Sequence, residues 1–81
     1  MSKSEPEVLK VVLDIAEEIL GGRPDPSAVM LETELQSLEI AGILVEAEDE
    51  LGLRVDEGDV DWSGVRTFAE FAAVIARAPS S

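Results

Sequence analysis

The sequence predicts an all-α fold, a small four-helix bundle of three main helices and one short helix, with a long loop after the first helix. Two observations support this fold class. Three segments carry apolar residues at the spacing that places them on one face of a helix. Serine or threonine in a capping position precedes two of these segments, and glycine follows two of them. A chain of 81 residues is expected to form one domain, residues 1–81, that buries about 60–65% of its unfolded surface.

The first helix is expected to begin after Ser4. The sequence Ser-Glu-Pro-Glu at residues 4–7 is a capping-box pattern, and Pro6 falls in the first turn, where a missing N–H costs nothing. The apolar residues that follow at helical spacing are Val8, Val12, Ile15 and Ile19, with Leu9, Ala16 and Leu20 beside them. Two glycines at residues 21–22 are expected to end the helix.

A long structured loop is expected next. Pro24 and Pro26 prevent a helix at this point. The apolar residues Met30, Leu31 and Leu35 are expected to cover one side of the core. Because a loop of this length in a small domain is often functional, it is a candidate part of the site.

The second helix is expected over residues 38–51, and its two faces differ. At about 100° per residue, one face gathers the apolar residues Ile40, Ile43, Leu44, Ala47 and Leu51, with Ala41 and Val45 beside them. The other face carries Glu39, Gly42, Glu46, Asp49 and Glu50. Such an acidic stripe is either an ordinary solvated face or a surface for a basic partner. Its position beside Ser37 favours a partner surface.

The last third of the chain combines an acidic, turn-rich segment with a final helix. Residues 52–55 are expected to lead out of the second helix, and residues 56–62 to form turns with one short helical element. Trp62 is expected to anchor this segment on the core. The final helix is expected to open at Thr67, where Glu70 completes a capping box. Its buried residues are predicted to be Phe68, Phe71, Ala72 and Ile75.

Composition excludes several classes of function. The chain has 18 acidic and 6 basic residues, a net charge of −12, which argues against nucleic acid or an anionic membrane as partners and favours proteins with basic patches. It has no Cys or His, so catalysis by the chain alone is not expected. No apolar run approaches the roughly 20 residues of a membrane span, and the N-terminus lacks an apolar signal core. We expect a cytoplasmic monomer that is not an enzyme.

Ser37 is the most informative residue, because it lies where the long loop meets the second helix. The surrounding residues 34–39 read Glu-Leu-Gln-Ser-Leu-Glu. This segment resembles the Asp-Ser-Leu motif of acyl and peptidyl carrier proteins, with Gln36 in place of the usual Asp. The order of the elements is similar to that of this family over nearly the whole chain, including the stretch at residues 51–55 and the helix that opens at Thr67.

The resemblance implies a freestanding acyl or aminoacyl carrier protein. Ser37 would carry a covalent 4'-phosphopantetheine, whose thiol holds the cargo as a thioester. The implied partners are a phosphopantetheinyl transferase, an acyl or aminoacyl ligase or transferase, and synthase enzymes. The residues expected to contact them are Gln36, Leu38, Glu39, Glu46 and Asp49. Asp61 and Trp62 are similar to a pair in D-alanyl carrier proteins, but this pair does not decide between acyl and aminoacyl cargo.

Other interpretations of this junction remain open. Gln36 lacks the charge that usually precedes the serine, and Gly42 stands where a glutamate is common in the family. Ser37 could be an unmodified N-cap. Thr33 and Gln36 also form a capping-box pattern, which would start the helix earlier and place Ser37 inside it.

A calcium-binding alternative rests on residues 59–70. They place Asp59, Asp61, Ser63, Thr67 and Glu70 at liganding positions of an EF-hand loop, with glycine at the sharp turn. However, Arg66 stands where an apolar residue is expected, glycines interrupt the entering helix, and no second loop pairs with this one. The alternative function is therefore an acidic regulatory module that binds calcium or a protein partner without a prosthetic group.

Overall fold

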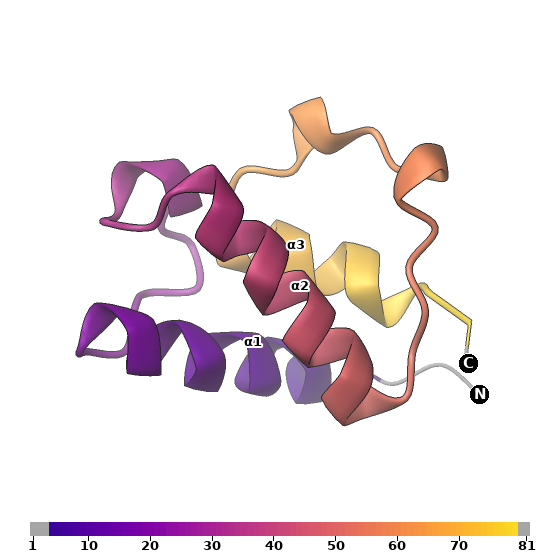
Figure 1. Cartoon of the computed structure of the whole chain (residues 1–81), viewed down its shortest axis with the longest axis horizontal. Coiled ribbons are helices and arrows are strands. Elements are labelled where there is room, and N and C mark those ends of the chain that lie inside the picture. Colours follow the sequence, from indigo (N-terminus) through magenta and orange to yellow (C-terminus); the bar gives the residue numbers. More distant parts are fainter. Residues whose placement is uncertain (1–3, 80–81) are drawn as a thin grey trace.

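A computed structural model describes residues 4–79 and has the predicted all-α architecture. Three α-helices make up the bundle: α1 (Glu5–Leu20), α2 (Ser37–Leu51) and α3 (Phe68–Ala76). Three short 3₁₀ turns lie between them: η1 (Met30–Glu32), η2 (Glu57–Asp59) and η3 (Trp62–Gly64). In Figure 1, α2 crosses in front of α1, and α3 lies behind α2. The molecule measures 31 × 23 × 20 Å.

Helix α1 begins and ends as predicted. The Ser4 hydroxyl accepts a hydrogen bond from the Glu7 N–H (3.4 Å), and Gly21 closes the helix in the left-handed conformation with φ 79°. One core prediction is wrong, because Ile19 is 42% exposed. Helix α1 packs against both α2 and α3, so its buried face is wide enough to include Leu13, while the last turn remains partly uncovered.

The core lies where the three helices meet. Its largest fully buried side chains come from every helix: Val8, Val12, Ile43, Phe68, Phe71 and Ile75. Residues from the connecting segments complete it, including Met30, Leu35, Leu53 and Val55. The two longest connections therefore belong to the packed structure.

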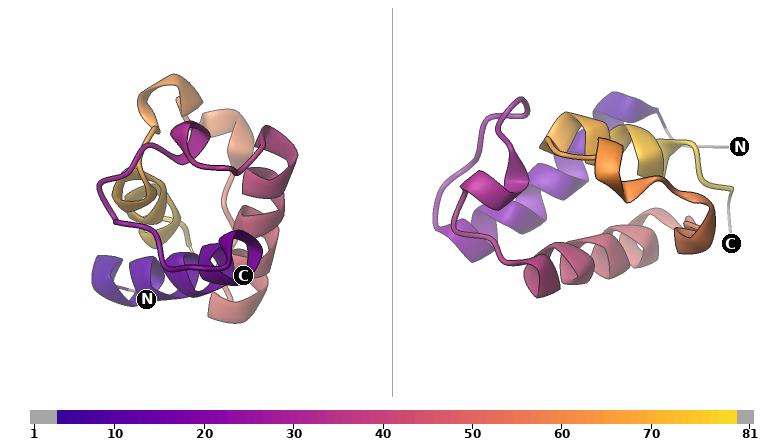
Figure 2. Two further views of the ribbon diagram at one scale, coloured as in Figure 1. Left: turned by 90° about the vertical axis from the view of Figure 1, so that its left-hand side faces the viewer. Right: turned by 90° about the horizontal axis from the view of Figure 1, so that it is seen from above.

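Backbone hydrogen bonds clamp the long first loop to the start of α3. The Met30 N–H donates to the Arg66 carbonyl (2.8 Å), and the Ala69 N–H donates to the Pro26 carbonyl (2.9 Å). Figure 2 shows the loop and the start of α3 side by side. The expected covering role is correct for Met30 and wrong for Leu31, which is 65% exposed, because the η1 turn directs neighbouring side chains to different sides.

The predicted fourth helix is only a 3₁₀ turn, repeated at η2 and η3. Asp56 and Asp61 begin these turns, and their carboxylates accept the N–H groups of Gly58 (3.1 Å) and Ser63 (3.2 Å). Such local side-chain bonds compete with a regular helix. Glu48 Oε2 of α2 fixes the start of this segment by accepting the Val55 N–H (2.8 Å).

The capping box of α3 forms as predicted. The Thr67 hydroxyl accepts the Glu70 N–H (3.1 Å), and Glu70 Oε1 accepts the Thr67 N–H (3.0 Å). The same oxygen also accepts the Arg66 N–H (3.1 Å). These bonds lower the pKa of Glu70 below its ordinary value, with the Thr67 backbone N–H making the largest contribution.

Candidate functional site

The candidate site begins at the N-terminus of α2. Gln36 is the N-cap residue and Ser37 is the first residue of the helix, so neither alternative holds, that Ser37 is the cap or that Thr33 begins the helix. The Thr33 hydroxyl instead donates to the Met30 carbonyl and accepts the Leu35 N–H (3.2 Å). The helix begins later because these bonds close the η1 turn before it.

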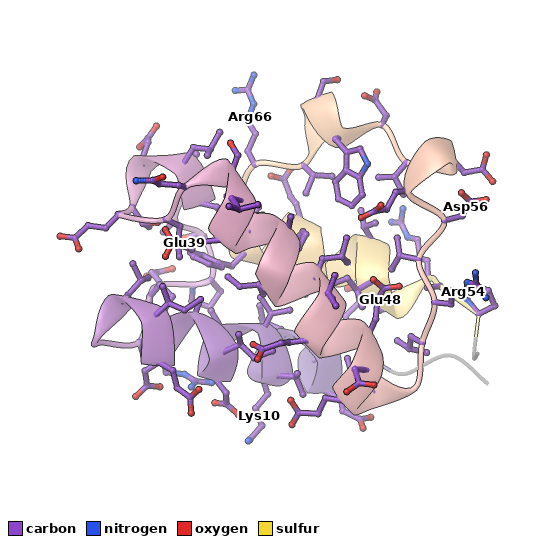
Figure 3. All side chains as sticks on the ribbon, in the orientation of Figure 1. Lys10, Glu39, Glu48, Arg54, Asp56 and Arg66 are labelled. Carbon is purple, nitrogen blue, oxygen red and sulfur yellow. The ribbon has the colours of Figure 1, made fainter. Side chains whose placement is uncertain are left out.

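Glu39 stabilises this helix start from within its first turn. Its Oε1 accepts the Gln36 N–H at 2.9 Å, and the Gln36 carbonyl accepts the first helical N–H, from Ile40, at 3.0 Å. Glu39 is consequently held against the backbone, which separates it from the freely exposed Glu46 and Asp49 further along α2. Its position is labelled in Figure 3.

The Ser37 side chain is exposed and available. Within residues 4–79, no hydrogen bond engages its hydroxyl, whereas the Ser27 and Ser63 hydroxyls donate to Asp25 (2.7 Å) and Asp61 (2.6 Å), and Ser4 caps α1. Backbone N–H groups of the first helical turn lack intrahelical acceptors and attract anionic groups. Ser37 thus combines an exposed hydroxyl with the N-terminal backbone N–H groups of a helix, beside the carboxylate of Glu39.

A cavity of about 730 Å³ opens beside Ser37. Apolar side chains dominate its wall and come from three parts of the chain: Val29, Met30 and Leu31 from the loop, Ile40, Ala41 and Leu44 from α2, and Trp62, Val65 and Phe71 from the C-terminal third. Four polar residues also line it: Glu32, Ser37, Glu57 and Arg66. An apolar hollow with one serine at a helix start can hold an apolar group that is attached to that serine.

Trp62 forms part of the cavity wall, as well as anchoring its own segment. Its indole N–H donates to the Glu57 carbonyl (3.1 Å), and its ring centroid lies 6.3 Å from that of Phe71. The side chain is half-buried against the core, as expected. The contact with Phe71 therefore ties the 3₁₀ segment to α3, while the hydrogen bond to Glu57 holds the indole against its own segment.

The exposed face of α2 combines carboxylates with apolar side chains. Leu38 is 84% exposed and Val45 is 61% exposed, and Glu46 and Asp49 lie exposed beside them. No basic residue occurs within α2. Figure 3 shows Lys10 projecting below α1 and Arg66 projecting from the opposite side of the molecule, so neither lies on this face.

A second cavity, of about 600 Å³, lies between the 3₁₀ segment and the C-terminal part of α3. Its wall includes Val60, Val65 and Val74 together with several carboxylates and Arg77. Ser37 does not line it. We therefore assign the candidate site to the cavity beside Ser37.

The EF-hand pattern does not form a cluster of ligands. Glu70 Oε1 is occupied by two backbone N–H groups, and Asp61 Oδ1 accepts both the N–H and the hydroxyl of Ser63. Across the described residues, no group of three or more carboxylates is placed to hold a metal ion. Asp61, Thr67 and Glu70 serve local capping instead.

The structure unites only part of the predicted site. Gln36, Ser37, Leu38 and Glu39 share the first turn of α2, while Glu46 and Asp49 lie two to three turns further along the same helix. Sequence reasoning missed the cavity, whose walls are far apart in the chain. The unusual concentration of Leu31, Trp62 and Val65 in otherwise polar segments was the available signal.

Comparisons with protein-family models, with curated proteins and with solved structures give no match. In residues 4–79, no helix is both long and apolar enough to cross a membrane.

Proposed function

We propose that this chain is a freestanding carrier protein that presents an acyl or aminoacyl group on a 4'-phosphopantetheine attached to Ser37. The observation that carries the proposal is the free, exposed Ser37 hydroxyl at the start of α2, directly at the edge of an apolar cavity. The resemblance of residues 34–39 to the carrier motif supports the same serine. We propose a monomer that acts in the cytoplasm.

The residues around Ser37 fit this prosthetic group. The N–H groups of the first turn of α2 would face its phosphate, and the apolar wall beside Ser37 would receive its cargo. When bound, the group supplies a thiol that forms a thioester with the cargo. The chain contains no Cys, so the thiol that forms the thioester must come from a prosthetic group.

Attachment uses Ser37 as a nucleophile. Its Oγ attacks the pantetheine-side phosphorus of the coenzyme A pyrophosphate, an Oγ–P bond forms, and the P–O bond to the nucleotide half breaks. The hydroxyl proton passes to a base of the transferase, which also supplies magnesium. The carrier itself contributes no catalytic residue, so it is a substrate of its partners and not an enzyme.

The exposed face of α2 is the proposed docking surface for these partners. Leu38 and Val45 supply apolar contact area, and Glu46 and Asp49 supply negative charge for a basic rim. Gln36 lies at the end of this face nearest Ser37. A transferase, a loading ligase or transferase, and a synthase would each approach along α2.

Intact mass spectrometry tests the proposal. After incubation with coenzyme A and a broad-specificity phosphopantetheinyl transferase, the wild-type protein should gain one phosphopantetheine. Ser37→Ala should gain none while keeping the helical circular dichroism spectrum, because the Ser37 hydroxyl makes no hydrogen bond to residues 4–79. Ser27→Ala and Ser63→Ala are matched controls that should be modified like wild type. Modification elsewhere, or none when a known carrier is converted, would refute the assignment.

A further inference from the structure

We propose that Trp62 limits the length of the apolar chain that the cavity beside Ser37 accepts. For natural cargo, the inference rests on the proposed carrier function. The length limit of the cavity itself can be tested without a prosthetic group. Trp62 would be a specificity-determining residue, which selects uncharged chains up to a certain length.

The direction of the cavity follows from α2. Ser37, Ile40, Ala41 and Leu44 all line it, and they span two turns of the helix. At about 1.5 Å per residue, the wall that α2 supplies is about 10 Å long. A chain attached at residue 37 would therefore lie along α2 and reach Leu44.

Trp62 lines the same cavity from the facing segment and is held there firmly. Its indole N–H donates to the Glu57 carbonyl of the same 3₁₀ segment (3.1 Å), and its ring contacts Phe71 of α3, so both contacts restrain the side chain. Phe71 is itself buried in the core, with 1% of its surface exposed. An entering chain would have to displace an anchored indole to go further, and the indole resists displacement because its movement breaks both contacts.

A second hollow lies beyond this wall. The cavity of about 600 Å³ on the other side of the 3₁₀ segment shares Val65 with the first cavity. The separation between the two cavities is therefore no thicker than the segment that carries Trp62 and Val65. A smaller side chain at position 62 should let a longer chain extend toward the second cavity, so Trp62 acts as the end wall.

The lining favours an uncharged occupant. Nine of the thirteen lining residues are apolar. The charged ones include both signs, and Arg66 projects outward from the molecule in Figure 3. A straight acyl chain matches this wall better than a charged one, since burying an unpaired charge against apolar side chains is costly.

Alkyl groups attached directly to position 37 provide the test. Because the chain has no Cys, Ser37→Cys introduces a unique thiol. Its thiolate attacks the sulfenyl sulfur of an alkyl methanethiosulfonate, forming a mixed disulfide and releasing methanesulfinate. A series from ethyl to dodecyl places chains of increasing length at the cavity edge. The probe is the alkyl chain itself, and neither coenzyme A nor a transferase is involved.

The melting temperature should rise with chain length relative to the unmodified Ser37→Cys protein, and then stop rising at one member of the series. The emission of Trp62, the only Trp in a chain without Tyr, should shift to shorter wavelength over the same members. Ser27→Cys, whose residue does not line the cavity, is the matched control and should show no dependence on chain length.

Substitution of Trp62 distinguishes a limit on chain length from a stabilisation that depends only on the hydrophobicity of the attached chain. In Ser37→Cys with Trp62→Leu, the limit should move by at least two members toward longer chains. Trp62→Phe should move it less. Each alkylated protein is compared with its own unmodified form, so a loss of basal stability does not obscure the result.

An unchanged limit in both Trp62 variants would overturn the proposal. So would a melting temperature that does not depend on chain length at position 37, or that depends on it equally at positions 37 and 27. These results are independent of the carrier assignment. If the alkyl series behaves as expected but the transferase fails to modify Ser37, only the carrier function is refuted. If Ser37 is modified but the limit ignores position 62, only the role of Trp62 is refuted.

Discussion

At the start of α2, the side chains that cap the helix are different from the one that presents a free hydroxyl. Gln36 occupies the cap position and Glu39 holds its N–H, which leaves the hydroxyl of Ser37 unused. In the other described serines, a carboxylate or a backbone N–H engages the hydroxyl. A reactive serine needs this freedom, because a hydroxyl committed to a structural bond must break it before attack.

Replacing Gln36 separates its effect on helix capping from its effect on recognition by the transferase. We expect Gln36→Asp and Gln36→Asn both to raise the free energy of unfolding by about 0.5–1 kcal/mol, since Asp and Asn are preferred caps. Only Gln36→Asp should speed modification of Ser37, because only Asp restores the charge that the carrier motif carries. Denaturant unfolding and time-resolved intact mass measure the two effects. An unchanged or slower rate in Gln36→Asp would indicate a transferase matched to glutamine.

Glu70 gives α3 a pH-dependent cap. N–H groups of Thr67 and Arg66 lower the pKa of its carboxyl below the ordinary value of 4.5. The Glu70 carboxyl therefore binds a proton more tightly in the unfolded chain than in the folded one. The ionised cap stabilises the fold fully at pH values above the ordinary pKa, and this stabilisation is lost as the pH falls through the lowered pKa.

We expect the stability difference between wild type and Glu70→Gln to be largest near neutral pH and to shrink in acid. Thr67→Ala is the control, because it removes the uncharged half of the capping box and its cost should depend less on pH. Thermal unfolding across a pH series measures both. A difference that stays constant into strong acid would contradict the ionised cap.

Helix α2 gathers the proposed functions along its length. Its first turn presents Ser37, one face lines the cavity through Ile40 and Leu44, and its exposed face carries Leu38, Glu46 and others. On the proposed function, docking and cargo would therefore share one helix. A partner bound to the exposed face would lie within a few turns of the attachment point.

Reversing the charge at Glu46 and Asp49 should slow association with the transferase, most strongly at low salt. These side chains make no hydrogen bond among the described residues, so stability should change by less than about 0.5 kcal/mol. Glu5 and Asp59, exposed and outside α2, are the control pair for the same change in net charge. The measurement is kcat/KM for modification across an ionic-strength series. Equal rates for both double variants at every salt concentration would reject steering by α2.

Elements with local signals were predictable from the sequence. The caps at Ser4 and Thr67 depend on residues within one turn, and both formed as expected. The segment at residues 53–66 was less predictable, because its turns depend on Asp56 and Asp61 and on how Trp62 meets Phe71. The cavity could not be predicted at all, since its walls meet only through tertiary packing.

Across the whole molecule, charge is distributed unevenly. The ion pairs in the described residues all lie on the α1 side, where Lys10 and Arg23 contact Asp14 (3.0 and 2.6 Å) and Arg23 also contacts Glu17 (3.1 Å). The hydrogen bond from Arg23, followed by that from Lys10, lowers the pKa of Asp14. The carboxylates of α2 form no ion pair in the described residues, and their uncompensated negative potential would orient a basic partner before contact.

The net charge of −12 also predicts the response to divalent cations. Millimolar calcium should raise the melting temperature slightly, by screening repulsion between carboxylates, and magnesium should match it. Asp59→Ala should respond like wild type, because Asp59 belongs to no carboxylate cluster suited to a metal in the described part of the chain. A calcium-selective rise that disappears in Asp59→Ala would instead favour the calcium-binding alternative.

The cavity beside Ser37 has walls that are also the core, since Met30, Leu44 and Phe71 are almost fully buried and line it as well. A chain seated there adds contacts to the same side chains that hold the helices together, and any occupant that binds only the folded state suppresses unfolding. In a cell, proteases degrade the fraction of molecules that opens. On the proposed function, loaded molecules would outlive empty ones, and the abundance of the carrier would follow the supply of its cargo.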